Sequence, residues 1–325
     1  MSAKIKRIGV LTSGGDAPGM NPCIRAVVRT GLFNDCEVIG IRDGYAGLLN
    51  GSFEVLEARQ VGGIIQRGGT MLGTARSPEM YEEAGQRAAL QALRQHEIDG
   101  LIVIGGDGSM RGGLALAERG VPVVGIPGSI DNDMWGTNMA IGVDTALNTL
   151  CDAIDKLRDT ASSHRRAFLV ETMGRNCGYL ALMAGVIGGA EVILIPEAPS
   201  TIEKVAEALV GAYQRGKTHS IVVVSEGANI KVAELAQHLE ELGVGFSTRM
   251  TILGHIQRGG RPSAFDRLLA TRLGVKAVDA LLAGYSNVMV GLRGRDIDLV
   301  PLADVVSRQR EANLEYYEMA KMLAF

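Results

Sequence analysis

The chain has 325 residues, of which 46% are apolar and 21% are charged, and its formal net charge is −3. This composition is ordinary for a globular protein and argues against intrinsic disorder. The small charge and the absence of a basic run give no reason to expect a nucleic-acid partner. No apolar run reaches membrane-spanning length, the N-terminal run is too short for a signal peptide, and the four cysteines lack paired or metal-ligand spacing. We therefore expect a cytoplasmic protein with free thiols and no membrane partner.

Short apolar runs rich in β-branched residues alternate with helical patterns along almost the whole chain. We predict strands at residues 7–13, 37–43, 100–106, 121–129, 166–174, 191–197 and 219–227. These runs are apolar throughout, which is typical of parallel strands that are covered on both faces. Helical patterns occupy residues 78–96, 144–159 and 201–216. The alternation predicts an α/β fold with mainly parallel sheets, whose ligands bind beyond the carboxyl ends of the strands.

Residues 211–218, GAYQRGKT, match the letter pattern of a P-loop, in which Lys217 would contact phosphate and Thr218 magnesium. A true P-loop follows a strand and opens a helix, so that backbone N–H groups face the phosphates. Here a helical pattern precedes the motif and a strand pattern follows it. We therefore interpret the motif as a helix end, where Arg215 and Lys217 suit the negative pole of the helix and remain able to bind another anion.

Two other glycine-rich loops have the context that a phosphate site requires. GVLTSGGDAPGMN, at residues 9–21, and IVIGGDGSMRGG, at residues 102–113, each follow a predicted strand and open a helical pattern. Each loop places small residues, N–H groups and one aspartate (Asp16 or Asp107) at the carboxyl end of its strand. Glycine in such a turn can also serve packing alone. Two such loops together predict a site for phosphate and magnesium.

A third motif, PGSIDND at residues 127–133, follows another apolar strand. In extended backbone Asp131 and Asp133 point the same way, and such a pair suits magnesium binding and general-base chemistry. A turn with solvated acids is the alternative. Cationic residues, several of them in glycine-flanked strand ends, also stand out as candidates to bind phosphate, namely Arg76, Arg166, Arg175, Arg249, His255 and Arg258. Any one of them alone is more typical of a surface charge. His255 alone could equally be a structural histidine.

The motifs GVLTSGGDAPGMN, IGGDGS, PGSIDND, SSHRR, MGRNCG and LGHIQRGG, in this order, resemble those of the bacterial ATP-dependent 6-phosphofructokinase family over nearly the whole chain. The resemblance implies two Rossmann-like α/β domains with mainly parallel sheets, an active site in the cleft between them, and a homotetramer with sites shared between subunits. It implies a large ATP-binding domain at 1–142 and 256–306, and a smaller sugar-phosphate-binding domain at 143–255 and 307–325. The implied glycolytic reaction transfers the γ-phosphoryl group of ATP, with Mg²⁺ as cofactor, to the 1-hydroxyl of fructose 6-phosphate, which gives fructose 1,6-bisphosphate.

The resemblance also implies roles for individual residues. Asp131 would be the general base, whereas Asp107 and Asp133 would hold the metal. Arg175 and Arg76 would stabilise charge on the moving phosphoryl group. The implied ATP side comprises Gly15, Tyr45, Arg76, Ser77, Gly108, Ser109 and Gly112. The implied sugar-phosphate side comprises Ser129, Asp131, Arg166, Met173, Gly174, Arg175, Glu226, Arg249, His255 and Arg258, with Arg166 and Arg249 reaching in from a neighbouring subunit.

Further residues match an effector site of the family for ADP or phosphoenolpyruvate. They are Arg25, Arg29, Arg158, Glu191, Arg215 and Lys217. At another basic position of that site this chain has Ala58, with Arg59 one residue away. We expect allosteric regulation in which GAYQRGKT contacts a regulatory phosphate.

Two glycines bear on the phosphoryl donor. In pyrophosphate-dependent relatives a bulkier acid takes the place of Gly108 and a lysine that of Gly128, and these side chains would fill space that ATP needs. The sequence therefore favours ATP. The alternatives are a pyrophosphate-dependent or other sugar-phosphate kinase, and a non-catalytic nucleotide sensor. The presence of Asp107, Asp131 and Arg175 argues against the sensor.

Overall fold

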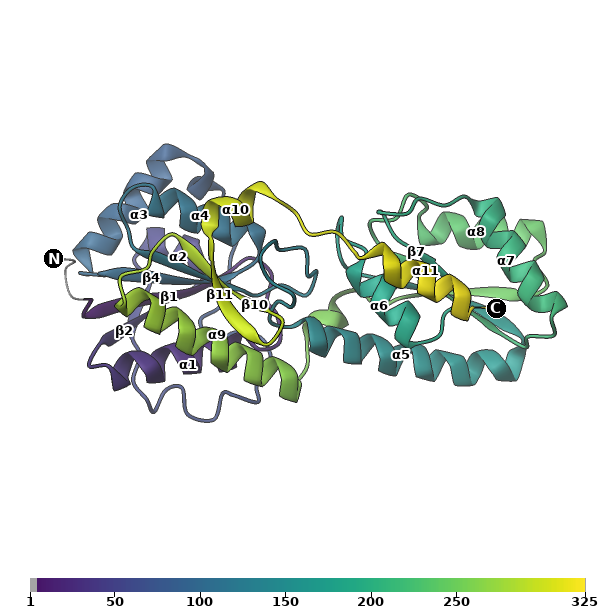
Figure 1. The fold of residues 1–325 in the computed structure, drawn as a ribbon, viewed down its shortest axis with the longest axis horizontal. Coiled ribbons are helices and arrows are strands. Elements are labelled where there is room, and N and C mark those ends of the chain that lie inside the picture. Colours follow the sequence, from purple (N-terminus) through teal and green to yellow (C-terminus); the bar gives the residue numbers. More distant parts are fainter. Residues whose placement is uncertain (1–4, 325) are drawn as a thin grey trace. The chain divides into compact units, whose positions relative to one another are not determined.

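The computed structural model describes residues 5–324 of the chain, which divide into two compact units (Figure 1). Unit 1 comprises residues 5–129, 134–145 and 258–309. Unit 2 comprises residues 130–133, 146–257 and 310–324. Each unit has its own sheet and its own hydrophobic core, so each is described by itself.

The described part of unit 1 contains a seven-stranded sheet in the order β11–β10–β5–β4–β1–β2–β3. Neighbours from β10 to β2 pair in parallel, while β3 and β11 add antiparallel edges. Every residue of the central strand β4 is buried, which explains its continuous apolar sequence. The strands are β1 (Arg7–Ser13), β2 (Glu37–Ile41), β3 (Phe53–Val55), β4 (Gly100–Gly105), β5 (Val123–Pro127), β10 (Val288–Arg293) and β11 (Asp296–Pro301).

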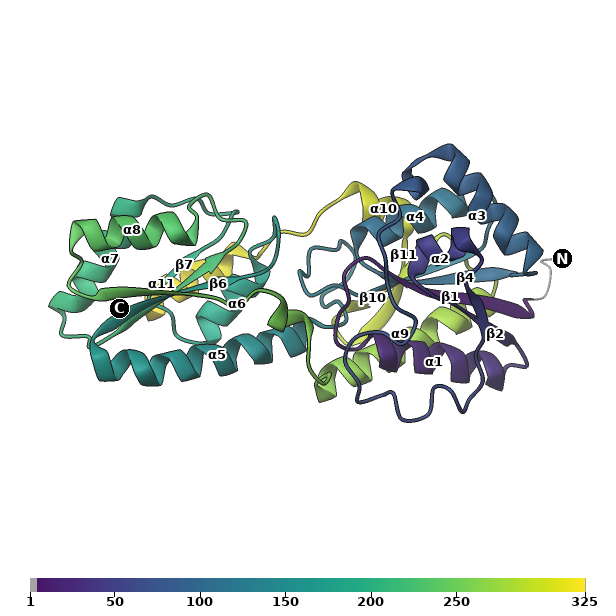
Figure 2. The same cartoon turned by 180° about the vertical axis from the view of Figure 1, so that it is seen from behind.

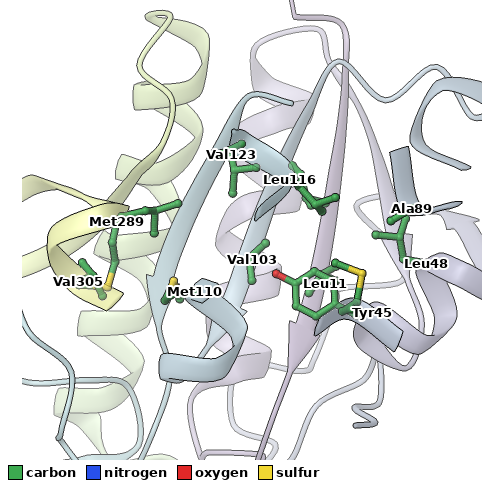
Figure 3. Close-up of a cluster of buried hydrophobic side chains, with 14 of the residues drawn as sticks. Leu11, Tyr45, Leu48, Ala89, Val103, Met110, Leu116, Val123, Met289 and Val305 are labelled. Atoms are coloured by element: carbon green, nitrogen blue, oxygen red, sulfur yellow. The ribbon is translucent and has the colours of Figure 1, made fainter. Parts of the chain in front are cut away.

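Helices cover both faces of this sheet (Figure 2). On one face α1 packs along α9, and Gly274 permits their close approach because a Cβ there would lie 2.7 Å from Cβ of Ala26. On the other face Tyr45, Met110 and Leu116 pack against the sheet residues Leu11 and Val103 (Figure 3). The elements are α1 (Met20–Phe33), α2 (Gly44–Asn50), η1 (Pro78–Tyr81), α3 (Glu83–Gln95), α4 (Asp107–Ala117), α9 (Ala264–Leu282) and α10 (Leu302–Ser307).

Within the described residues, unit 2 is built on a parallel four-stranded sheet in the order β7–β8–β6–β9. In both views α7 and α8 lie on one face of the sheet, whereas α5, α6 and α11 lie on the other (Figures 1 and 2). The strands are β6 (Arg166–Thr172), β7 (Val192–Leu194), β8 (Ser220–Ser225) and β9 (Ser247–Ile252). The helices are α5 (Val143–His164), α6 (Tyr179–Ile187), α7 (Ile202–Gln214), α8 (Val232–Leu242), η2 (Gly254–Arg258) and α11 (Leu314–Leu323).

The α/β fold with mainly parallel sheets is confirmed, and a strand lies at each of the seven predicted places. The interpretation of GAYQRGKT is also confirmed, because α7 ends at Gln214 and β8 begins at Ser220. The four cysteines form no disulfide in the part of the chain that the structure describes. Among residues 5–324, no helix is both long and apolar enough to cross a bilayer.

Candidate active site

The two glycine-rich loops of unit 1 lie side by side. Strand β1 pairs with β4 so that Ser13 is opposite Gly105, at the carboxyl ends of both strands. The first loop bends through Gly14 and Gly19, with φ of 84° and 118°, and it opens α1 without a side-chain cap and without an acidic residue in the first turn. At the start of α1, however, the N–H of Met20 already donates to the carbonyl oxygen of Ala17 at 3.2 Å and Pro22 has no N–H, so this helix end offers few N–H groups to an anion.

The second loop opens α4 at Asp107. The hydroxyl of Ser109 is buried and has no hydrogen-bond partner among the described residues. A Cβ on Gly14 would lie 3.3 Å from this hydroxyl, and one on Gly105 would overlap it, so Ser109 lies between the two loops. A buried hydroxyl in this place can bind a polar group of a ligand, because leaving it without a partner costs about 1–3 kcal/mol.

Arg258 is the last residue of η2 and belongs to unit 1, where it packs onto the first loop of the same unit. Its Nη1 donates to the carbonyl oxygen of Asp16 at 3.4 Å, and its Nε is buried with no partner among the described residues. A Cβ on Gly15 would overlap Nη1 and lie 2.8 Å from Cζ of Arg258. The structure therefore brings together Gly15, predicted on the ATP side, and Arg258, predicted on the sugar-phosphate side.

Tyr45 lies beneath the second loop. Its hydroxyl donates to the carbonyl oxygen of Ser109 at 2.7 Å, and a Cβ on Gly112 would lie 2.7 Å from its ring. Burial raises the pKa of the Tyr45 hydroxyl above its ordinary value. These contacts make Tyr45 and Gly112 internal supports of α4. By contrast, Arg76 is exposed in the loop before η1.

The loop that carries the paired aspartates follows β5. Asp131 is 3% exposed, and Asn132 is buried in a left-handed conformation with φ of 53°. Nε of Arg175 lies 3.4 Å from Oδ2 of Asp131, and the arginine side chain is 61% exposed. A buried carboxylate beside a solvent-facing guanidinium is an arrangement in which one group can take a proton while the other stabilises negative charge on a substrate.

The backbone after β6 is held by side chains from other elements. Gly174 and Arg175 have φ of 140° and 50°, respectively. Their N–H groups donate to Oε1 of Glu226 at 3.2 and 2.8 Å. A Cβ on Gly227 would overlap the carbonyl oxygen of Arg175, so this glycine permits the close approach. Burial, followed by the nearby charge of Glu226, raises the pKa of Glu171 on the preceding strand.

The remaining predicted phosphate ligands are at least partly exposed. His255 is exposed in η2. Ser247 on the edge strand β9 is opposite Arg166, and Arg249 is opposite Phe168, so Arg166 and Arg249 lie on the same face of the sheet. Arg249 is half-exposed and contacts the carbonyl oxygen of Thr248 at 2.6 Å.

The carboxylates of the candidate site suit a metal ion that binds together with a nucleotide. No group of three or more His, Cys, Asp or Glu side chains within residues 5–324 could hold a metal ion. Mg²⁺ is commonly bound by one or two carboxylates together with substrate phosphates and water. Asp107 suits this role, because its carboxylate is held by Arg111 at 2.8 Å in a weak surface pair that a bound metal can replace.

The comparison with protein families decides the assignment. The family described as phosphofructokinase matches residues 7–281. The chain belongs to the phosphofructokinase family. It is 53% identical over 321 residues to the ATP-dependent 6-phosphofructokinase of Thermotoga neapolitana, covering 98% of this chain and 100% of that protein.

Solved structures agree on the fold. The phosphofructokinase of Saccharomyces cerevisiae superposes with a TM-score of 0.86 at 39% identity, covering 93% of this chain and 45% of that chain, so this chain spans less than half of the yeast protein. A pyrophosphate-dependent phosphofructokinase from Marinobacter aquaeolei has a TM-score of 0.87 at 23% identity, covering 96% of this chain and 86% of that one. Because that fold is shared by an enzyme with another donor, the fold alone does not identify the donor.

Gly108 and Gly128, the two glycines that bear on the choice of phosphoryl donor, differ in their surroundings. A Cβ on Gly108 would meet only the Tyr81 hydroxyl, at 3.7 Å, whereas one on Gly128 would lie 3.3 Å from Met20 and 3.4 Å from Ile104. Open space at Gly108 is consistent with room for a ligand. Gly128 also serves packing, which the sequence alone did not reveal.

The predicted effector residues of unit 2 are engaged with neighbouring groups. Nζ of Lys217 lies 3.2 Å from both Oε1 of Glu191 and the carbonyl oxygen of Ala324. Arg158 donates to the carbonyl oxygens of Gly188 and Gly189, the latter at 3.1 Å. Arg215 is the C-terminal cap of α7. Arg25 and Arg29 lie on α1 of unit 1.

Sequence reasoning missed Gln257, a completely buried side chain that contacts the backbone at Met173. Gln257 belongs to the LGHIQRGG motif and lies between His255 and Arg258, which were both predicted as ligands. A buried amide has no periodicity that marks it, so only the structure reveals its partners.

Proposed function

We propose that the chain is an ATP-dependent 6-phosphofructokinase, which transfers the γ-phosphoryl group of ATP to the 1-hydroxyl of fructose 6-phosphate. The observation that carries the proposal is the buried Asp131 carboxylate with Arg175 at 3.4 Å. This pair supplies a base and a phosphoryl-facing cation within a chain 53% identical to an ATP-dependent 6-phosphofructokinase.

Asp131 takes the proton of the 1-hydroxyl as the oxygen attacks phosphorus. A positioned base of this kind contributes about 10²–10⁴ in rate. Arg175, whose guanidinium is largely exposed, stabilises negative charge on the moving phosphoryl group together with Arg76. Phosphoryl transfer needs positioning and charge neutralisation more than covalent chemistry, and these residues provide both.

The ATP phosphates bind at the paired loops of unit 1. The buried hydroxyl of Ser109 is a suitable donor, and Gly108, whose Cβ would meet only the Tyr81 hydroxyl at 3.7 Å, leaves room for close approach. Gly15, Ser77 and Gly112 complete the predicted ATP side. Asp107 and Asp133 would hold Mg²⁺ together with the phosphates, and the bound ion would supply charge neutralisation. Tyr45 acts indirectly, because its hydroxyl supports Ser109 from the core.

The sugar phosphate is held by residues near the ends of β5, β6 and β8 and in η2. His255 and Arg258 bind the 6-phosphate, while Ser129, Met173, Gly174 and Glu226 surround the sugar. Arg166 on β6 and Arg249 on the edge strand β9 share one face of the sheet, which supports a role in a neighbouring subunit's site. Three features stay predictions from the sequence. They are the homotetramer, the binding of ATP and of sugar phosphate by different domains, and the cytoplasmic location.

A regulatory anion, ADP or phosphoenolpyruvate, binds at a subunit interface that is lined by Arg25, Arg29, Arg158, Glu191, Arg215 and Lys217. The ion pair between Lys217 and Glu191 supports this, since an anion can exchange with the carboxylate. Equal effector affinity in the wild type and in an Arg215→Ala/Lys217→Ala double variant would exclude this pair.

A donor comparison tests the proposal. Purified protein is assayed with fructose 6-phosphate and Mg²⁺, in parallel with ATP and with pyrophosphate. Turnover with ATP alone is expected. Turnover with pyrophosphate alone would support fructose 6-phosphate as the acceptor but contradict ATP as the donor. Turnover with neither donor would contradict the proposed reaction.

A further inference from the structure

Gln257 connects two segments that the proposed function places at the sugar phosphate. Its side chain is completely buried and both atoms of its amide group are bonded to the backbone, so we assign it no contact with a substrate. Oε1 accepts the N–H of Met173 at 3.1 Å, and Nε2 donates to the carbonyl oxygen of Gly254 at 2.9 Å. One amide group therefore joins the segment after β6 to η2, although Met173 and Gln257 are 84 residues apart.

The first of these segments has a backbone that needs external support. Gly174 and Arg175 both have positive φ, and a non-glycine residue such as Arg175 adopts this conformation at some cost. Three successive N–H groups donate to side-chain oxygens, that of Met173 to Gln257 and those of Gly174 and Arg175 to Glu226. The two side chains together stabilise the bend that brings Nε of Arg175 to 3.4 Å from Asp131.

The second segment begins at a left-handed glycine. Gly254 has φ of 51°, and His255 follows it directly. The bond from Nε2 of Gln257 to Gly254 spans three residues and closes the first turn of η2. The orientation of this turn determines where the exposed His255 imidazole points.

We propose that Gln257 is a positioning residue, which holds the Arg175 bend and the His255 turn in register so that both reach one sugar phosphate. This inference rests on the proposed function. A displacement of about 1 Å in a positioned group can lower a rate about 10²-fold, so a hydrogen-bonded link between two such segments has kinetic consequences.

Two substitutions and one control test the role in the full chain. Gln257→Met keeps the length and shape of the side chain and removes both hydrogen bonds. Gln257→Glu keeps an acceptor for Met173 and loses the donor to Gly254. Thr201→Ala removes the N-cap of α7 in the same unit and none of the contacts above. The kcat and the KM for fructose 6-phosphate and for ATP are measured for each protein.

We expect Gln257→Met to lower kcat/KM for fructose 6-phosphate about 10²-fold with the KM for ATP within about threefold of wild type. We expect Gln257→Glu to lose about tenfold and Thr201→Ala to match wild type. A folded Gln257→Met with wild-type kcat/KM for fructose 6-phosphate, or with a KM for ATP raised more than about threefold, would overturn the inference. If Gln257→Met does not fold, Gln257→Glu decides: the selective tenfold loss supports the role, and wild-type kinetics contradict it. A wild-type protein without turnover would instead overturn the proposed function.

Discussion

Gly15→Ala is a perturbation whose effect follows from one contact. The new Cβ would overlap Nη1 of Arg258 and lie 2.8 Å from its Cζ, so the guanidinium must move. The clash involves the end of a flexible side chain, and Gly15 does not have positive φ, so the fold itself tolerates alanine. We expect the free energy of unfolding to change by less than about 0.5 kcal/mol.

The kinetic effect of Gly15→Ala is expected to be much larger. A charged hydrogen-bond donor contributes about 1.5–3 kcal/mol, and 1.4 kcal/mol corresponds to a factor of ten. Displacement of Arg258 from a sugar phosphate should therefore raise the KM for fructose 6-phosphate by about 10- to 100-fold. Steady-state kinetics at saturating ATP measure this value directly.

A double-mutant cycle with Arg258→Ala shows whether the effect passes through the arginine. If it does, Gly15→Ala has little further effect once Arg258 has been truncated, so the two losses are strongly non-additive. Fully additive losses, or a single variant within threefold of the wild-type KM, would refute the reasoning.

Three further substitutions address the donor site and the stability of the two units. Gly108→Asp should raise the KM for ATP at least about tenfold at unchanged thermal stability, because its Cβ meets only Tyr81; an unchanged KM would contradict this. Asp266→Asn should lower the free energy of unfolding by about 2 kcal/mol, measured in urea, because the buried carboxylate accepts hydrogen bonds from Gly142 and Thr145; a loss below about 0.5 kcal/mol would contradict it. Burial and the charge of Glu226 raise the pKa of Glu171 on folding, so stability falls as the pH rises from its ordinary value near 4.5 through the raised pKa. Glu171→Gln should remove this fall in pH-dependent unfolding curves, and parallel curves for both proteins would exclude it.

The parallel strands could be predicted because their position in the fold dictates their composition. Strand β4 is buried along its whole length and reads as an unbroken apolar run. Strand β9 was not predicted, since it is a half-exposed edge strand whose sequence, STRMTI, is mostly polar. Strand β11 likewise alternates in burial at an antiparallel edge.

The sequence predicts the motifs of the candidate site, but it does not predict the contacts between their residues. Glycine and aspartate at strand ends indicated which loops are candidates for a phosphate site, because that chemistry is local to each loop. The packing of Arg258 on Gly15, the burial of Tyr45 and the link through Gln257 depend on residues that are distant in sequence. Such contacts are set by tertiary packing, which a single sequence does not display.

The most direct test of the account is the turnover of Asp131→Ser with fructose 6-phosphate and ATP, with ATP binding measured on the same protein. If Asp131 is the base, the rate should fall by about 10²–10⁴ while the ATP affinity stays within about threefold of wild type. A variant that keeps more than about a tenth of the wild-type rate would contradict the assignment of Asp131 as the base.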